Sequence, residues 1–207
     1  MNFRDMLNEM PVAVLGDWDN KIIKSITITR KVIEKNWKHL DTTSYNSHKL
    51  EVYTMESHDI YMLGAWGYEE LDGIKKDVFI VITQGNLAKR RDLTSQFKEF
   101  KNVYQMKKIS TEPPFRGKGY ASFLYMYLIY NGMEIVSDMV QYDGARATYS
   151  KLSRLPSIKA YIIDAYEKEI IKKDTIVKQG FDDWDFDEEV WSYDFKKSNI
   201  LIVLKAK

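Results

Sequence analysis

Residues 113–123, PPFRGKGYASF, concentrate features that suit the binding of an anion. The chain has ten glycines and four prolines, and two of each lie within residues 113–119. Gly117 and Gly119 leave the backbone bare just before an apolar run, while Arg116 and Lys118 add positive charge. Free N–H groups at the start of a helix carry the positive end of its dipole, so this loop suits a phosphate group. The competing interpretation is a tight turn without a ligand.

The loop differs from two common phosphate-binding motifs. A Walker A loop needs Lys followed by Ser or Thr after its last glycine, whereas Tyr120 follows Gly119 here. The dinucleotide fingerprint needs a third glycine, and none follows Gly119 at the right spacing. The spacing therefore argues against both a nucleoside triphosphate site and a dinucleotide site.

The surrounding pattern predicts elements that would place this loop at the N-terminus of a helix. Residues 103–111 alternate as a strand does, and residues 121–130 are apolar nearly all round and end at Asn131-Gly132. Residues 133–139 are expected to form the next strand, and residues 142–155 a second helix that ends before Pro156. This order predicts a β-α-β unit with an anion site at the start of its helix.

Residues 116–121, RGKGYA, resemble the Arg/Gln-x-x-Gly-x-Gly/Ala signature of the GNAT family of N-acetyltransferases, and their setting between a strand and a buried helix is similar too. The resemblance implies that backbone N–H groups of one loop bind the pyrophosphate of acetyl-CoA, the loop being Arg116, Gly117, Lys118, Gly119, Tyr120 and Ala121. It also implies that the end of the preceding strand pairs with the pantetheine arm and polarises the thioester carbonyl, through Ile109, Ser110 and Thr111.

The second predicted helix carries another likeness to this family. Ala145 and Tyr149 keep the register of the family's Asn-x-x-Ala-x-x-x-Tyr helix and, four residues apart, share one face. The sequence departs from the pattern at Tyr142, where Asn is usual, and at Ser153-Arg154, where Gly-Phe is usual. The resemblance implies that Tyr149 protonates the departing CoA thiolate, and the alternative is a tyrosine that only packs.

An amine must lose a proton before it attacks a thioester, so a carboxylate or a water chain has to act as base. Asp138 and Glu112 lie at the ends of the two predicted strands, and splayed strand ends bracket the reaction centre in the GNAT fold. Both carboxylates are therefore candidate bases. For each of them, the alternative is a solvated loop carboxylate.

The resemblance implies a mixed α/β fold with a mostly antiparallel central sheet flanked by helices. It implies direct transfer of an acetyl group from acetyl-CoA to a primary amine of a small molecule, a polyamine or a protein lysine. Residues 136–138, 144–146 and 149–152 look similar to a branch of the family common in bacteriophages and prophages. Two alternatives stay open, namely a nucleobase- or DNA-modifying enzyme of phage origin and an inactive interaction protein that kept the fold.

Outside the β-α-β unit, the patterns predict mostly strands. A helix is expected over residues 19–40, although residues 25–29 alternate as a strand would. A hairpin is expected from residues 50–53 and 60–63, and a turn at residues 72–73. A further strand is expected over residues 77–82, ending at the polar cluster of residues 84–86. Residues 87–101 are expected to form a short helix or a loop. Three late strands are expected at residues 158–163, 169–171 and 200–204.

Three groups of charged or titratable residues carry further hypotheses. Residues 182–189, DDWDFDEE, hold six acids in eight positions and form either a solvated loop or a lip that attracts a cationic amine. The basic residues between positions 89 and 108 could touch phosphates of CoA or of nucleic acid, and the near-zero net charge disfavours nucleic acid. The histidines lack metal-ligand spacing, so no metal site is predicted at His39, His48 or His58.

The composition is that of a globular protein. The chain has 207 residues, a formal net charge of +1 and no cysteine, which excludes disulfides and thiolate chemistry. We expect a single domain over residues 1–207 with its cofactor-binding core at residues 103–155. The first residues lack a signal-peptide core and no run approaches a membrane helix, so we expect a cytoplasmic protein, in the host cytoplasm if phage-encoded.

Overall fold

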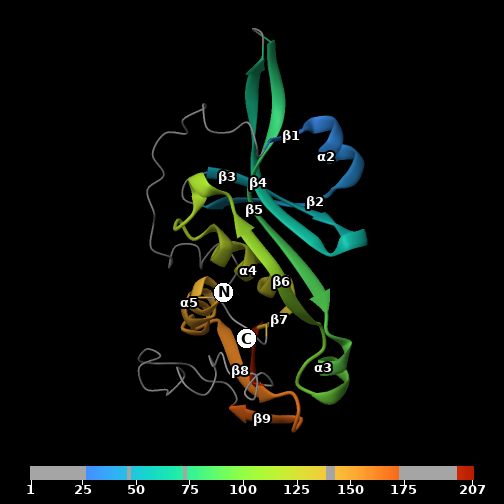
Figure 1. Cartoon of the computed structure of the whole chain (residues 1–207), viewed down its shortest axis with the longest axis vertical. Helices are drawn as coiled ribbons and strands as arrows, with labels where there is room; N and C mark the ends of the chain where they lie inside the picture. Colours follow the sequence, from blue (N-terminus) through green and yellow to red (C-terminus); the bar gives the residue numbers. More distant parts are fainter. Residues whose placement is uncertain (1–26, 46–47, 72–73, 139–142, 173–199) are drawn as a thin grey trace. The chain divides into compact units, whose positions relative to one another are not determined.

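The computed structural model describes residues 27–45, 48–71, 74–138, 143–172 and 200–207. These residues form four α-helices and a mostly antiparallel sheet of ten strands (Figure 1). The predicted mixed class with a mostly antiparallel sheet is therefore confirmed. The chain divides into two compact units: residues 1–87 with 108–124, and residues 88–107 with 125–207.

The first unit is built on antiparallel hairpins. Its strands pair in the order β2, β3, β4 and β5, with β1 also on β5. The bounds of these strands, and of helix α2 between β1 and β2, are β1 Thr27–Thr29, α2 Arg30–Asn36, β2 Lys38–Tyr45, β3 His48–Met55, β4 Ile60–Leu71 and β5 Ile74–Lys89. A 3-10 turn, Glu56–His58, joins β3 to β4, which confirms the hairpin predicted there.

Two sequence predictions for this unit were wrong in extent. The helix expected over residues 19–40 is confined to Arg30–Asn36 in the described part of the chain, because Ile28 lies in a strand that pairs with Phe79. The strand expected to end at residues 84–86 continues to Lys89, because Gly85 and Asn86 pair with β4. Cross-strand pairing thus overrides the local turn preference of these residues. The predicted turn at residues 72–73 lies outside the described residues.

The first unit has an aromatic core. Phe79 of β5 contacts Tyr53 and Trp66 edge to face, with ring centroids 5.1 and 5.4 Å apart. Ile33 of α2 and Met62 of β4 complete the cluster and are buried. These contacts fasten α2 to the sheet, since Ile33 is the one buried residue of that helix.

The second unit contains most of the predicted β-α-β unit. Strand β6 and helix α4 each run along the chain from one unit into the other, and β6 pairs in parallel with β7. The remaining strands pair antiparallel in the order β7, β10, β8 and β9. The bounds are α3 Arg91–Gln96, β6 Val103–Thr111, α4 Tyr120–Tyr130, β7 Glu134–Val136, α5 Asp143–Ser153, β8 Ile158–Asp164, β9 Glu169–Lys172 and β10 Ile200–Ala206.

The predicted order of strand, loop, buried helix, strand and second helix is confirmed. Helix α4 is apolar all round and buried along most of its length, and it ends before Gly132, whose φ of 85° is left-handed. Strand β7 is shorter than predicted, at three residues. Its parallel pairing with β6 stops at Gln105 opposite Val136, although β6 continues to Thr111.

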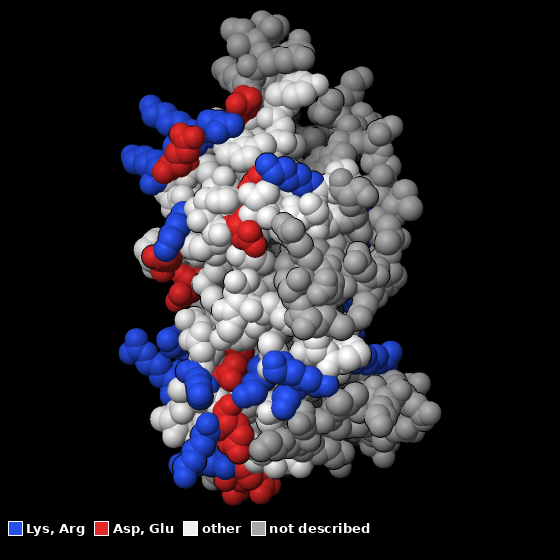
Figure 2. All heavy atoms as spheres, turned by 180° about the vertical axis from the view of Figure 1, so that it is seen from behind, with Lys and Arg blue, Asp and Glu red and all other residues white. Residues whose placement is uncertain are grey.

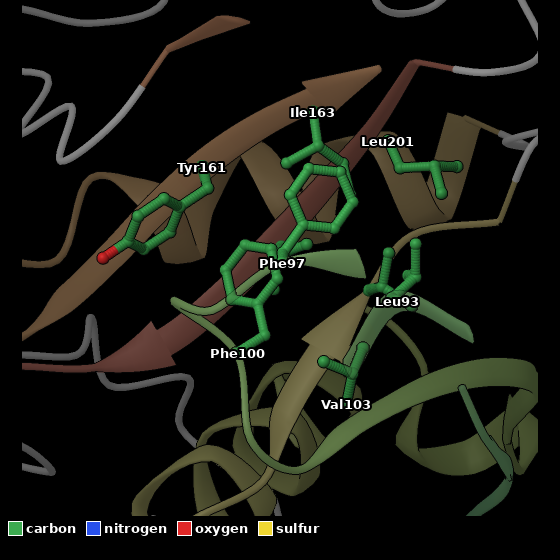
Figure 3. Packing of buried hydrophobic residues seen from close by; sticks show 9 residues of the cluster. Leu93, Phe97, Phe100, Val103, Tyr161, Ile163 and Leu201 are labelled. Atoms are coloured by element: carbon green, nitrogen blue, oxygen red, sulfur yellow. The ribbon is translucent and has the colours of Figure 1, made fainter. Parts of the chain in front are cut away.

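The core of the second unit joins α3 to the sheet. Leu93 of α3 and Phe97, which directly follows that helix, lie against Tyr161 and Ile163 of β8 and Leu201 of β10 (Figure 3). Phe100, which follows α3, contacts Phe97 and Tyr161 at ring centroid distances of 5.7 and 5.3 Å. The late strands predicted at residues 158–163, 169–171 and 200–204 are confirmed, and their apolar side chains build this core. Within the described part of the chain, no helix has both the length and the apolar character needed to span a membrane.

Candidate functional site

The loop before α4 has the bare, left-handed backbone that its glycines predict. Gly117 and Gly119 have φ values of 73° and 84°, a region that costs other L-residues about 1–2 kcal/mol. A Cβ atom at Gly117 would meet nothing within 4 Å, so the glycine is required by its backbone angle and not by crowding. The amide of Phe123 donates to the Gly119 carbonyl at 2.9 Å and so begins the helix.

The amides of Tyr120, Ala121 and Ser122 precede that first bond, and helix geometry gives such amides no intrahelical acceptor. They belong to the positive end of an 11-residue helix. The loop therefore has the geometry of an anion site.

Two side-chain hydrogen bonds hold the loop in place. Arg116 Nε donates to the Thr111 carbonyl at 3.0 Å, and the hydroxyl of Tyr45 donates to the Lys118 carbonyl at 3.1 Å. The 3-10 turn Pro113–Phe115 stiffens the approach, with the Phe115 amide donating to the Glu112 carbonyl at 2.9 Å. The loop is thus tied to the end of β6 and to the end of β2.

The residues predicted to lie along the pantetheine arm form the C-terminal end of strand β6. Ile109 and Thr111 are half-buried and Ser110 is exposed. The Thr111 hydroxyl lies 2.7 Å from that of Thr83, and the Glu112 amide donates to the Ile82 carbonyl at 2.9 Å. Both contacts attach this end of β6 to β5. Glu112, one of the two candidate bases, is half-buried next to the loop in the same unit.

Asp138, the other candidate base, belongs to a polar network in the second unit. Gln105 of β6 donates from Nε2 to Asp138 Oδ1 at 2.8 Å, and Gln105 is 2% exposed. The Gln105 Oε1 atom accepts from Lys107 Nζ at 2.6 Å and from Arg90 Nη1 at 3.3 Å. Because two cations can bond only the oxygen of the amide, the NH₂ group must face the carboxylate. The Asp138 carboxylate is therefore oriented by a buried amide.

Tyr149, the predicted general acid, lies on α5 and is 2% exposed. Its hydroxyl lies near that of Tyr125 of α4 but makes no hydrogen bond of ordinary geometry to any residue that the structure describes, and the centroids of the two rings are 5.6 Å apart. Burial raises its pKa well above 10.0, and the neighbouring Tyr125 hydroxyl and Asp138 carboxylate raise it further. Tyr149 thus stays protonated at neutral pH, as a proton donor must, and Asp138 is close enough to act on it electrostatically.

Two residues of this arrangement were not predicted from the sequence. Tyr45 lies 73 positions from its partner Lys118, and Gln105 lies 33 positions from Asp138, so no local motif relates them. The one available signal was the polar Gln105 in an alternating strand, at a position where an apolar residue is usual.

The predicted basic stretch is partly committed to other contacts. Arg90 binds Asp92 at 2.6 Å, Lys107 binds Gln105, and Lys89 lies over the ring of Tyr104 at 5.5 Å. Figure 2 shows blue and red side chains interspersed on the face that it displays. On that face (Figure 2), the described side chains do not form the continuous basic surface that nucleic acid requires.

Of the three histidines, only His48 lies near the loop. His39 Nε2 lies 2.8 Å from Glu51, His58 Nδ1 lies 2.7 Å from Ser57, and among the described residues no group of metal-binding side chains could hold an ion. The pKa of His48 is lowered by burial and by the charge of Lys118 in the loop. The acidic segment at residues 182–189 lies outside the described residues.

Comparison of the chain with models of known protein families gives no match, and comparison with the sequences of curated proteins gives none either.

Proposed function

We propose that the protein is an acetyl-CoA-dependent N-acetyltransferase that moves an acetyl group directly to a primary amine. The observation that supports this most is the loop with two left-handed glycines, 117 and 119, between β6 and the first turn of the buried helix α4. Backbone N–H groups in that setting favour a diphosphate. The resemblance of residues 116–121 to the GNAT signature supports CoA as the source of that diphosphate.

In this proposal each group of residues has its own chemical task. The amides of the loop hold the phosphates, and the end of β6 offers backbone groups to the pantetheine arm and the thioester oxygen. Tyr149 is the proposed acid, and a carboxylate is the proposed base. Asp138 is favoured as the base because its charge acts on Tyr149, the proposed acid, whereas Glu112 is the alternative.

Bound acetyl-CoA supplies a thioester, which is an activated acyl group. Asp138 takes one proton from the protonated amine, directly or through water, so that the neutral nitrogen can form its bond to the acetyl carbon as the bond from that carbon to sulfur breaks. Tyr149 gives its proton to the sulfur and so prevents a thiolate from leaving unprotonated. The second proton that the nitrogen loses replaces the one that Tyr149 gives to the sulfur. The raised pKa of Tyr149 keeps the phenol protonated at neutral pH but makes it a weaker acid, so its proton has to move as charge develops on the sulfur.

Calorimetric titration of acetyl-CoA tests the cofactor site. The wild type should bind in a saturable way, and Gly119→Glu should not, because its side chain would block and repel the diphosphate. Gly132→Glu is the matched control, since Gly132 has the same left-handed backbone at the other end of α4, with φ of 85°. Absence of binding by the wild type would refute the proposal.

Turnover is tested by CoA release with a panel of amines, including polyamines and lysine peptides. We expect Tyr149→Phe to lower kcat by about 10²-fold or more while acetyl-CoA affinity is kept, since a general acid contributes typically that much. Binding without turnover on any amine would instead support an interaction protein that kept the fold.

A further inference from the structure

We propose that the diphosphate site extends to a pair of tyrosines, Tyr45 and Tyr120, of which Tyr45 positions the loop and Tyr120 donates a hydrogen bond to the ligand. This inference rests on the proposed function, because it concerns the same loop. It adds the end of β2, far away in sequence, to the residues that determine cofactor affinity.

Tyr45 fixes the direction of one peptide group in the loop. Its hydroxyl donates to the Lys118 carbonyl at 3.1 Å, and the chain contains no cis peptide among the described residues. In a trans peptide the C=O and N–H bonds point in opposite directions. The N–H of Gly119 therefore points away from Tyr45, and within the described part of the chain no acceptor is found for it.

The ring of Tyr45 fixes the start of the helix at the same time. It contacts Tyr120 and Phe123 of α4 at ring centroid distances of 5.2 and 4.8 Å, and Tyr45 is 4% exposed. One buried side chain thus holds both the peptide before the helix and the first turn of the helix. Such a contact keeps the loop amides in one orientation before a ligand arrives, which lowers the entropic cost of binding.

The hydroxyl of Tyr120 is the observation that points independently to a ligand. Tyr120 is 1% exposed, and its hydroxyl has no hydrogen-bond partner among the described residues. Its ring contacts those of Tyr45 and Phe115 at centroid distances of 5.2 and 6.0 Å, so the side chain belongs to the aromatic cluster at the loop and the start of α4. A buried donor without an acceptor is costly, and a phosphate oxygen at the loop would satisfy it.

Conservative substitutions separate these roles from packing. Tyr45→Phe keeps the ring and removes the hydroxyl, and Tyr120→Phe does the same at the start of α4. Tyr130→Phe is the matched control, because it removes a hydroxyl that donates to Ser157 at 2.6 Å at the other end of the helix. All three variants are titrated with CoA by calorimetry and unfolded with urea.

We expect Tyr45→Phe to weaken CoA binding about fivefold, the loss typical of one hydrogen bond, while Tyr130→Phe binds as the wild type does. Tyr120→Phe should bind CoA more weakly and yet be more stable, because it loses an unsatisfied buried hydroxyl. A purely structural role would not lower affinity while raising stability. If Tyr45→Phe does not fold, Tyr120→Phe decides the question alone.

The amide signal of Gly119 in a ¹⁵N NMR spectrum, titrated with inorganic pyrophosphate, gives a second readout. We expect it to shift in the wild type and to shift less at equal concentration in Tyr45→Phe. Equal CoA affinity and equal Gly119 response in the wild type and Tyr45→Phe overturn the inference and leave the proposed function intact. A wild type that binds no CoA overturns the proposed function. The tyrosine pair is then still supported if Gly119 responds to pyrophosphate, and it is refuted if Gly119 does not.

Discussion

Gly117→Ala provides a quantitative test of the loop geometry, because its cost can be worked out from the backbone alone. The φ of Gly117 is 73°, and a Cβ atom there would touch nothing within 4 Å. Only conformational terms therefore enter: the left-handed region costs alanine about 1–2 kcal/mol. The less flexible unfolded chain returns about 0.4–1 kcal/mol. The net loss should be roughly 0.5–1.5 kcal/mol, or about 2–5 °C in Tm for a chain of this size.

Gly132→Ala is its matched control. Gly132 has a φ of 85°, and a Cβ atom there also meets nothing within 4 Å, so the expected loss of stability is the same. The two variants should differ only in ligand binding, because Gly117 lies in the loop and Gly132 follows the end of α4. We expect Gly117→Ala to weaken CoA binding by up to about tenfold, since the left-handed penalty of about 1–2 kcal/mol favours other loop conformations, in which the amides after residue 117 are rotated.

Thermal unfolding measures the stability of each variant, and calorimetric titration measures its affinity for CoA. Unchanged stability in both variants would refute the left-handed strain. Equal loss of stability with equal CoA affinity in both would refute the loop as the phosphate site. Loss of stability in both with loss of CoA binding in Gly117→Ala alone is the predicted result.

Three further predictions follow from other contacts. Gly64→Ala should lower the free energy of unfolding by about 2–3 kcal/mol, because its Cβ would overlap the backbone carbonyl of Ile80. Gly67→Ala should lower it by less than about 1 kcal/mol, because its Cβ would meet only the flexible end of the Ile80 side chain, at 2.7 Å. Urea unfolding measures both values. Glu134→Ala should lower the free energy of unfolding by about 2–4 kcal/mol in the same assay, because its carboxylate accepts the amides of residues 101 and 102 at 2.7 and 3.0 Å, and a smaller loss would show that water replaces it. His48 has a pKa below its ordinary 6.5 in the folded state, so the unfolded chain binds more protons. Stability should therefore fall as the pH is lowered through about 6.5, and His48→Asn should reduce this fall. An unchanged pH profile of urea midpoints in the variant would contradict the assignment.

The elements nearest the proposed site were the most predictable ones. The alternation over residues 103–111 gave β6 with its bounds, and the uniformly apolar stretch that stops at Gly132 gave α4 to within one residue. These segments have strong local signals, either a clear period or a glycine in the left-handed region. The first unit was less predictable, because Gln84-Gly85-Asn86 favours a turn and lies within β5 only through its pairing with β4. Pairing between distant segments leaves no local trace in a single sequence.

The same distinction applies to the candidate site. The glycines, Tyr149 and Asp138 carry chemistry in their residue types, so they could be proposed from the sequence. Tyr45 and Gln105 act through other residues, and their tasks depend on where the fold brings them. A tyrosine that holds a carbonyl and a tyrosine that only packs have the same sequence signature, and the hydrogen-bond partner alone distinguishes them.

The loop also explains why its supporting residues matter as much as its glycines. Glycine permits a left-handed backbone but does not require it, since it adopts positive and negative φ almost equally well. Something else must select the conformation, and two bonds contribute: Arg116 ties the loop to the carbonyl of Thr111, and Tyr45 binds the carbonyl of Lys118. The N–H that follows the Thr111 carbonyl is that of Glu112, and it donates to Ile82. Of these two bonds, only that of Tyr45 acts on a peptide group of the loop, and in a trans peptide the Gly119 N–H then points away from Tyr45. A site made of backbone amides is therefore specified by the side chains that bind the opposite ends of the same peptide groups.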